Sequence, residues 1–201
     1  PYRMDDVTSS YTDSYHRFVD EGGFAVLRLD LRGTGSSGGF ATDEYPDVER
    51  SDLSTVMEWI AAQPWSSGRV GMFGTSYSGF NSLHMAMENV PQLGAVAAMY
   101  ATDDRYTDDV HYIGGVLRAL DLIDYPLYMV AMNALPPVPA VWAQGHETPW
   151  RDEWMRRLTQ HEPWLLTWLR HPLPDPIWRR GSVRTAPRTG YERYTCPVLS
   201  I

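Results

Sequence analysis

The chain has 201 residues, which is the size of one ordinary domain or of part of a larger one. Hydrophobic residues make up 43% of it, which is ample for a packed core and excludes a disordered chain. The formal net charge of −8, from 25 acidic and 17 basic residues, argues against the cationic surface that binding to nucleic acid needs.

The basic residues and the cysteine exclude several kinds of site. All 17 basic residues are arginine, so no lysine is present for a Walker phosphate loop, a Schiff base or a Ser-Lys dyad. Cys196 is the single cysteine, so an internal disulfide and a cysteine-based zinc site are excluded. We expect neither a metal nor a cofactor.

Predicted strands and helices alternate through the first half of the chain. Ser51 is the expected N-cap of a helix that begins at Asp52 and ends before Pro64. A second helix is expected over residues 77–89, where apolar side chains follow helical spacing. Buried strands are expected at residues 24–30, 69–73 and 93–100. This order predicts an α/β fold, with a parallel sheet covered by helices on both faces.

The composition and the predicted elements change after the first half of the chain. Residues 112–180 contain most of the tryptophans and prolines, have helical stretches such as 150–158, and include no convincing strand. Strand character returns at residues 197–201. We therefore predict part of an α/β core at 1–111, a helical cap at 112–190 and the start of the next core strand at 191–201.

One uncharged stretch has the length of a membrane span. Residues 125–143 contain no charged side chain over nineteen positions, but they include four prolines. Four prolines would leave backbone carbonyls unsatisfied in lipid, so we predict a buried or pocket-lining segment of the cap and no membrane partner.

The most informative string stands between a predicted strand and a predicted helix, and reads Gly74-Thr75-Ser76-Tyr77-Ser78-Gly79. A serine in a sharp strand-to-helix turn has a strained backbone and needs small neighbours, so that strand and helix can approach each other. Such a turn lifts the Ser76 hydroxyl above the carboxyl end of the sheet and directs the Tyr77 amide at an oxyanion. Ser78 departs from the general Gly-x-Ser-x-Gly pattern, and an ordinary turn serine is the alternative reading.

A second glycine-rich string, residues 33–38, matches the dinucleotide fingerprint Gly-x-Gly-x-x-Gly and follows a predicted strand. A dinucleotide site also needs a helix that opens within the glycines, but residues 39–46 read as loop. An oxidoreductase is therefore a minor alternative.

These motifs resemble the X-Pro dipeptidyl-peptidase-like, or cocaine esterase-type, family of serine hydrolases, which has the α/β-hydrolase fold. In that family the second glycine of the elbow comes one place late, as Gly79 does, and a glycine-rich loop follows the fourth strand. The resemblance covers nearly the whole chain. It rests on residues 30–35 with Gly38, residues 59–65, Gly68, residues 70–72 and 74–79, residues 102–106, Gly114-Gly115, His171-Pro172 with Trp178, and residues 196–198.

The resemblance implies three site features. Tyr2 falls on the family's oxyanion-hole tyrosine, whose hydroxyl joins the amide of Tyr77. The triad Asp and His are expected beyond Ile201, and a central strand of the sheet before Pro1, so the chain looks like an internal fragment that is incomplete at both ends and inactive alone. An internal triad is the less favoured alternative; it would use Asp103 or Asp104 and one of His111, His146, His161 and His171.

We expect acyl-enzyme chemistry at Ser76 on an ester or on a peptide bond, with a small-molecule or peptide substrate. Trp65 and the acidic residues Asp103, Asp104 and Asp108 are the candidate substrate-binding residues, the acidic ones for a substrate ammonium group. A catalytically inactive binding module of hydrolase fold is the alternative from another class. The oligomeric state is not predicted, and the compartment is left open with the cytoplasm favoured.

Overall fold

The computed structural model describes residues 1–185 and 191–201. The chain forms two compact units: residues 1–42 with 126–164, and residues 43–125 with 165–201. The division at residues 111 and 190 stays a prediction, and residues 186–190 of the predicted cap lie outside the described residues.

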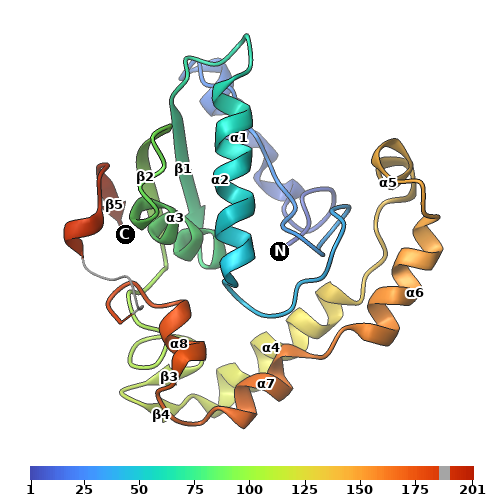
Figure 1. Cartoon of the computed structure of the whole chain (residues 1–201), viewed down its shortest axis with the longest axis vertical. Helices are drawn as coiled ribbons and strands as arrows, with labels where there is room; N and C mark the ends of the chain where they lie inside the picture. The colour runs from blue at the N-terminus through green and yellow to red at the C-terminus, as the bar shows by residue number, and fades with distance from the viewer. Residues whose placement is uncertain (186–190) are drawn as a thin grey trace. The chain divides into compact units, whose positions relative to one another are not determined.

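A three-stranded parallel sheet is the centre of the second unit (Figure 1). Its strands are β1 (Val70–Thr75), β2 (Leu93–Met99) and β5 (Val198–Ser200), in the order β1-β2-β5. The register places Val96 of β2 opposite both Met72 and Val198. These strands confirm the ones expected at 69–73, 93–100 and 197–201, and the parallel sheet with its flanking helices confirms the α/β fold.

Two helices pack beside this sheet. α3 (Tyr77–Met87) contacts β1 and β2, and α2 (Asp47–Ala61) contacts α3 and β1. Leu83 and Met87 of α3 pack with Ala98 of β2 in a buried cluster. The prediction of Ser51 as N-cap was wrong, because α2 begins five residues earlier than expected, at Asp47, behind an extended Pro46. Asp47 and Glu49 in its first turn match the positive end of the helix dipole.

The remaining elements of the second unit follow β2. β3 (Tyr112–Ile113) and β4 (Val116–Leu117) form a short antiparallel hairpin, so the expectation of no strand in this region was wrong. The short helices α7 (Trp164–Arg170) and α8 (Pro176–Arg180) and the 3-10 helix η2 (Tyr191–Arg193) complete the unit, apart from Trp164, which belongs to the first.

The first unit is built from helices and loops. It contains η1 (Ser9–Tyr11), α1 (Thr12–Asp20), α5 (Pro139–Gly145) and α6 (Trp150–Gln160), the last of which confirms the helix expected at 150–158. The strand expected at 24–30 was wrong: the segment is in no hydrogen-bonded ladder within the described residues. Phe24, Leu27 and Leu29 are 64%, 46% and 40% exposed. An apolar run favours extended backbone, but a strand also needs a neighbour to pair with.

The glycine-rich loop of the first unit is fixed by buried charges. The Asp30 carboxylate accepts hydrogen bonds from the backbone N–H groups of Met4 at 2.8 Å and Ser36 at 3.0 Å. Arg157 of α6 donates to the carbonyl oxygens of Gly35 and Ser37, both at 2.9 Å. No helix opens among these glycines, since the next one begins at residue 47, which confirms the loop expected there and disfavours a dinucleotide site.

The uncharged stretch 125–143 is divided between two helices. α4 (Ala119–Asn133) ends within it and α5 begins at Pro139. In the part of the chain that the structure describes, no helix combines the length and the apolar character that a membrane crossing requires.

Candidate functional site

Ser76 lies at the junction between β1 and α3 with φ 57° and ψ −122°. A left-handed backbone at a non-glycine residue costs about 1–3 kcal/mol and persists only where its surroundings fix it. Here the Ser76 N–H donates to the carbonyl of Met99 on β2 at 2.9 Å, and the Ser76 carbonyl accepts from the N–H of Phe80 at 2.9 Å. The sharp turn expected from the sequence is therefore present.

Small neighbours make this turn possible. A Cβ on Gly74 would lie 2.2 Å from the Cβ of Ser78, and one on Gly79 would lie 2.8 Å from the Met99 carbonyl oxygen. Both distances are well inside van der Waals contact. Only glycine at 74 and 79 lets strand and helix approach this closely.

Tyr77 is held firmly as the first residue of α3. Its side chain is buried, and its hydroxyl donates to Glu49 Oε2 at 2.9 Å and accepts from the Tyr45 N–H at 3.2 Å. Burial, the main cause, raises the pKa of Tyr77 well above its usual value and the pKa of Glu49 to about 7. The backbone N–H groups of a first helical turn point out of the helix start, so this anchoring also fixes the direction of the Tyr77 N–H.

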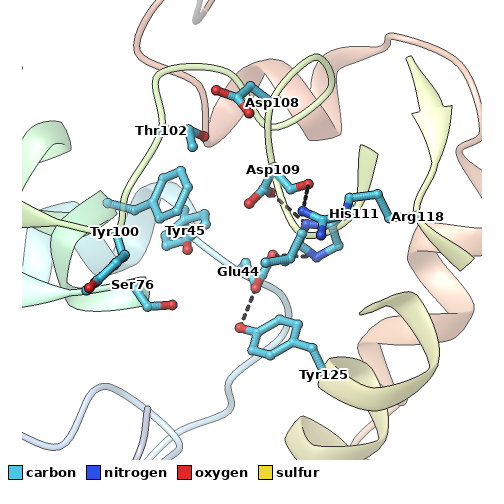
Figure 2. A pocket seen from close by; sticks show the side chains of 12 residues that line it. Glu44, Tyr45, Ser76, Tyr100, Thr102, Asp108, Asp109, His111, Arg118 and Tyr125 are labelled. Atoms are coloured by element: carbon cyan, nitrogen blue, oxygen red, sulfur yellow. Dashed lines mark hydrogen bonds and ion pairs between the residues drawn. The ribbon is translucent and has the colours of Figure 1, made fainter. Parts of the chain in front are cut away.

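Ser76 faces a cavity of about 150 Å³ within the second unit. In Figure 2 the Ser76 hydroxyl points to the side on which Glu44 and Tyr125 lie. The cavity is lined by Glu44, Tyr45, Ser76, Phe80, Tyr100, Thr102, Asp108, Asp109, Val110, His111, Arg118 and Tyr125.

Four buried charged groups form a cluster in and behind the wall of this cavity. Glu44 is in ion contact with Arg105, and its Oε2 lies 3.2 Å from His111 Nε2. His111 Nδ1 lies 2.7 Å from Asp109 Oδ2, and Arg105 Nε lies 3.9 Å from the same oxygen. We call Glu44, Arg105, Asp109 and His111 the charge cluster.

The charge cluster stays ionised despite its burial. Burial alone would raise the pKa of Glu44, but His111 and Arg105 lower it to about 2. Burial alone would lower the pKa of His111, but Glu44 and Asp109 raise it to about 9. At neutral pH Glu44 is therefore a carboxylate and His111 an imidazolium. With Asp109 and Arg105 at their formal charges, the cluster carries two negative and two positive charges.

The predicted acidic residues take different positions. Asp108 is exposed and lines the Ser76 cavity. Asp104 is buried, and its Oδ1 accepts from the N–H groups of Tyr106 at 2.9 Å and Thr107 at 3.0 Å, so it stabilises a turn. Asp103 accepts from the Tyr191 hydroxyl in a second cavity, of about 350 Å³. Only Asp108 is brought to Ser76.

Trp65 lies away from Ser76, and Tyr2 belongs to the other unit. Trp65 is 52% exposed and precedes β1, whereas Ser76 follows β1, so the strand separates them. This position gives its predicted binding role no support. Tyr2 belongs to the first unit, where its ring lies 6.2 Å from that of Tyr128. Its role in an oxyanion hole stays a prediction.

The histidines of the second unit are engaged away from Ser76 or held as cations. His84 Nε2 lies 3.0 Å from the Gly181 carbonyl oxygen, and burial lowers the pKa of His84 to about 3. His171 pairs with Asp175 at 2.5 Å and does not line the cavity. His111 lines it, but as an imidazolium it has no lone pair to accept a serine proton. This arrangement disfavours the internal triad that the sequence left open.

The sequence reasoning missed Glu44, Arg105 and Tyr125 of this site. The sequence contains only a weak signal for them, a carboxylate and an arginine among aromatic residues. Glu44 and Arg105 are more than sixty positions apart in the sequence. No local spacing pattern joins such residues, because tertiary packing alone brings them together.

Three comparisons with known proteins bear on this site. The family model of the X-Pro dipeptidyl-peptidase (S15 family) matches residues 1–201. The cocaine esterase of Rhodococcus sp. is 34% identical over 127 residues, which are 62% of this chain and 22% of the esterase. A Mycobacterium bovis protein that is provisionally named a serine esterase is 32% identical over 130 residues, or 64% of this chain and 20% of that protein.

Solved structures agree with the fold. A CocE/NonD family hydrolase from Staphylococcus aureus superposes with a TM-score of 0.56 and 26% identity, over 84% of this chain and 25% of its own. An α-amino acid ester hydrolase superposes with a TM-score of 0.60 at 18% identity, over 90% of this chain and 32% of its own, and shows the fold alone. The chain thus spans about a fifth of the curated relatives it matches. With the family model matched over all of its residues, the chain belongs to the X-Pro dipeptidyl-peptidase (S15) family.

Proposed function

We propose that the complete protein containing this chain is a serine hydrolase, which cleaves an ester or a peptide bond through an acyl-enzyme at Ser76. The observation that carries the proposal is the left-handed Ser76 at the strand-to-helix turn, with its hydroxyl facing a cavity. Family membership and the likeness to a cocaine esterase support the same chemistry.

In the proposed reaction, Ser76 Oγ attacks the substrate carbonyl carbon while a histidine takes its proton. The carbonyl oxygen becomes an oxyanion, which two donors stabilise: the Tyr77 N–H and the Tyr2 hydroxyl. Collapse expels the alcohol or amine, which takes up the proton, and leaves the acyl group on Ser76; water then releases the acid by the same steps. We place the histidine and its partner aspartate outside these 201 residues, since the histidines of the second unit are engaged otherwise.

For the substrate we propose an acyl group with an ammonium, bound at Asp108. Asp108 is the exposed carboxylate of the cavity lining, whereas Arg118 in the same lining lies 2.6 Å from Asp121. Asp103, Asp104 and Trp65 remain weaker candidates for substrate contacts because they do not line this cavity. Asp108→Asn is expected to remove the preference for a free amine over its N-acetyl form, and equal preference in both proteins would refute the subsite.

The nucleophile is tested by labelling the complete gene product with a fluorophosphonate probe. We expect the wild-type protein and Ser78→Ala to be labelled and to hydrolyse esters, and Ser76→Ala to do neither. Ser78→Ala is the matched control, because it removes a second hydroxyl from the same turn and keeps the Cβ. Equal labelling of the wild type and Ser76→Ala would overturn the assignment, and no labelling of any form would favour an inactive binding module.

The Tyr2 hydroxyl is tested by Tyr2→Phe. Loss of one oxyanion donor costs about 100- to 1000-fold in kcat, while KM changes little because the donor acts mainly in the transition state. Tyr128→Phe removes the hydroxyl of the neighbouring ring and serves as control. Equal kcat values for the two variants would remove Tyr2 from the proposed oxyanion hole.

A further inference from the structure

The four members of the charge cluster are buried and pair with one another. The side chains of Glu44, Arg105, Asp109 and His111 are all at most 5% exposed, and each contacts opposite charges within the cluster. Two carboxylates and two cations give a net charge of zero. Three of the four groups also line the Ser76 cavity, so a change in the net charge of the cluster changes the electrostatic potential inside the cavity.

Glu44 joins the parts of this cluster. Its Oε2 is in ion contact with both Arg105 and His111, while its Oε1 accepts a hydrogen bond from the Tyr125 hydroxyl at 2.6 Å. The Tyr125 ring stacks on Trp168 with an interplanar angle of 1°, and His111 packs edge-on against the same indole at 4.4 Å. One carboxylate therefore positions groups from the segment after β2 and from α4.

We propose that the balance of charges in the cluster leaves Asp108 to set which substrate charge the Ser76 cavity accepts, with Glu44 as the positioning residue that holds the cluster together. The inference rests on the proposed function for its catalytic meaning. With the cluster neutral and Arg118 paired to Asp121, Asp108 gives the lining its net negative charge. A cationic group is then bound in preference to a neutral one of the same shape.

Two single substitutions in the charge cluster are expected to have opposite effects on binding. Glu44→Gln removes a negative charge and leaves the cluster at +1, whereas His111→Gln removes a positive charge and leaves it at −1. A unit charge on the order of 10 Å from the ligand, at an effective dielectric constant of about 20, changes affinity roughly tenfold. A merely structural role would weaken binding of both ligands in both variants, without a change of sign.

The test measures dissociation constants by calorimetry on the complete gene product. The probes are two ketones that cannot be hydrolysed, one carrying a trimethylammonium group and the other the isosteric neutral tert-butyl group, whose charges do not vary with pH. We expect the affinity ratio of cationic to neutral probe to fall roughly tenfold in Glu44→Gln and to rise roughly tenfold in His111→Gln. Tyr125→Phe removes a hydroxyl without a change of charge and should leave the ratio within about twofold.

A pH series on the wild-type protein tests the same inference without a variant. The pKa of His111 is raised to about 9, so its proton is lost between neutral pH and pH 10, and the cluster then gains a negative charge. The groups that face His111 are Glu44, Asp109, Tyr125, Trp168, Trp178 and the backbone N–H of Arg118. Arg105 contacts the same two carboxylates, Glu44 and Asp109. We expect the ratio to rise across this range in the wild type and to stay flat in His111→Gln.

Failure of this inference is distinct from failure of the proposed function. Ratios that shift in the same direction in both charge variants, or that do not shift, would overturn the inference even if Ser76 is labelled. Opposite shifts would support it even if Ser76 is not labelled, because the binding measurement does not depend on turnover. If the variants do not fold, a flat pH series in the wild type overturns it.

Discussion

Replacement of Gly74 by alanine is the sharpest test of the strand-to-helix turn. The added Cβ would lie 2.2 Å from the Cβ of Ser78, 2.7 Å from its carbonyl carbon and 2.9 Å from its carbonyl oxygen. Carbon atoms in contact are about 3.5–4.0 Å apart, so the start of α3 must move away from β1 by more than about 1 Å. Two of the three clashes are with backbone, and a change of rotamer cannot relieve them.

This displacement has a cost in stability and a larger one in reactivity. Overpacking of this kind costs about 1–3 kcal/mol in the free energy of unfolding. A shift of about 1 Å at a catalytic group can lower a rate about 100-fold. We therefore expect Gly74→Ala to unfold at a lower urea concentration and to react with a fluorophosphonate about 100-fold more slowly than the wild type.

Gly71→Ala is the matched control on the same strand. Its added Cβ would meet only the Ala95 carbonyl oxygen, at 3.9 Å, which is ordinary contact. Its free energy of unfolding should stay within about 0.5 kcal/mol of the wild-type value, and its labelling rate should not change. Adding Ser78→Gly to Gly74→Ala should restore only part of the rate, since the backbone clashes remain. A Gly74→Ala protein that reacts as fast as Gly71→Ala would refute the close-approach argument.

Two further predictions concern buried charges. Burial raises the pKa of Glu49 from 4.5 to about 7, so between these pH values the folded state holds a proton that the unfolded state releases. The contribution of Glu49 to the free energy of unfolding is therefore complete below pH 4.5. It falls by on the order of 3 kcal/mol as the pH rises to 7. Urea titrations at a series of pH values should show this loss in the wild type and not in Glu49→Gln, and equal slopes would contradict it. Arg105→Met leaves the buried carboxylates of Glu44 and Asp109 with one cation fewer. Urea unfolding should show a free energy of unfolding that is lower by about 3–5 kcal/mol. A loss below about 1 kcal/mol would show that water reaches the cluster.

The elements around Ser76 could be predicted because their signals are local. The apolar run that precedes Gly74 and the helical spacing after Ser76 placed β1 and α3 to within two residues. The small residues at 74 and 79 report a contact between neighbours in sequence, so a sequence pattern can carry it. The left-handed backbone of Ser76 then follows from the turn itself.

The failures have different physical causes. The segment 24–30 has strand-forming residues, but a ladder depends on a partner that its own sequence does not encode. The β3–β4 hairpin did have a signal, since Gly114 and Gly115 both have positive φ, 57° and 78°, as two-residue hairpin turns require. The charge cluster had only a weak signal, because Glu44 meets Arg105 and His111 only through tertiary packing.

The segment before α2 links the turn at Ser76 to the charge cluster. Glu44 holds the cluster, while its neighbour Tyr45 places its ring 4.4 Å from that of Tyr77 and donates its N–H to the Tyr77 hydroxyl. Tyr45 has φ 52°, a strained value that persists only because both sides are anchored: by Tyr77 and by Arg105, whose guanidinium lies 5.1 Å from the Tyr45 ring centroid. A change at Tyr45 should therefore disturb both the Tyr77 amide of the proposed oxyanion hole and the charge of the cavity. Glu49→Gln should disturb only the amide, and His111→Gln only the charge of the cavity.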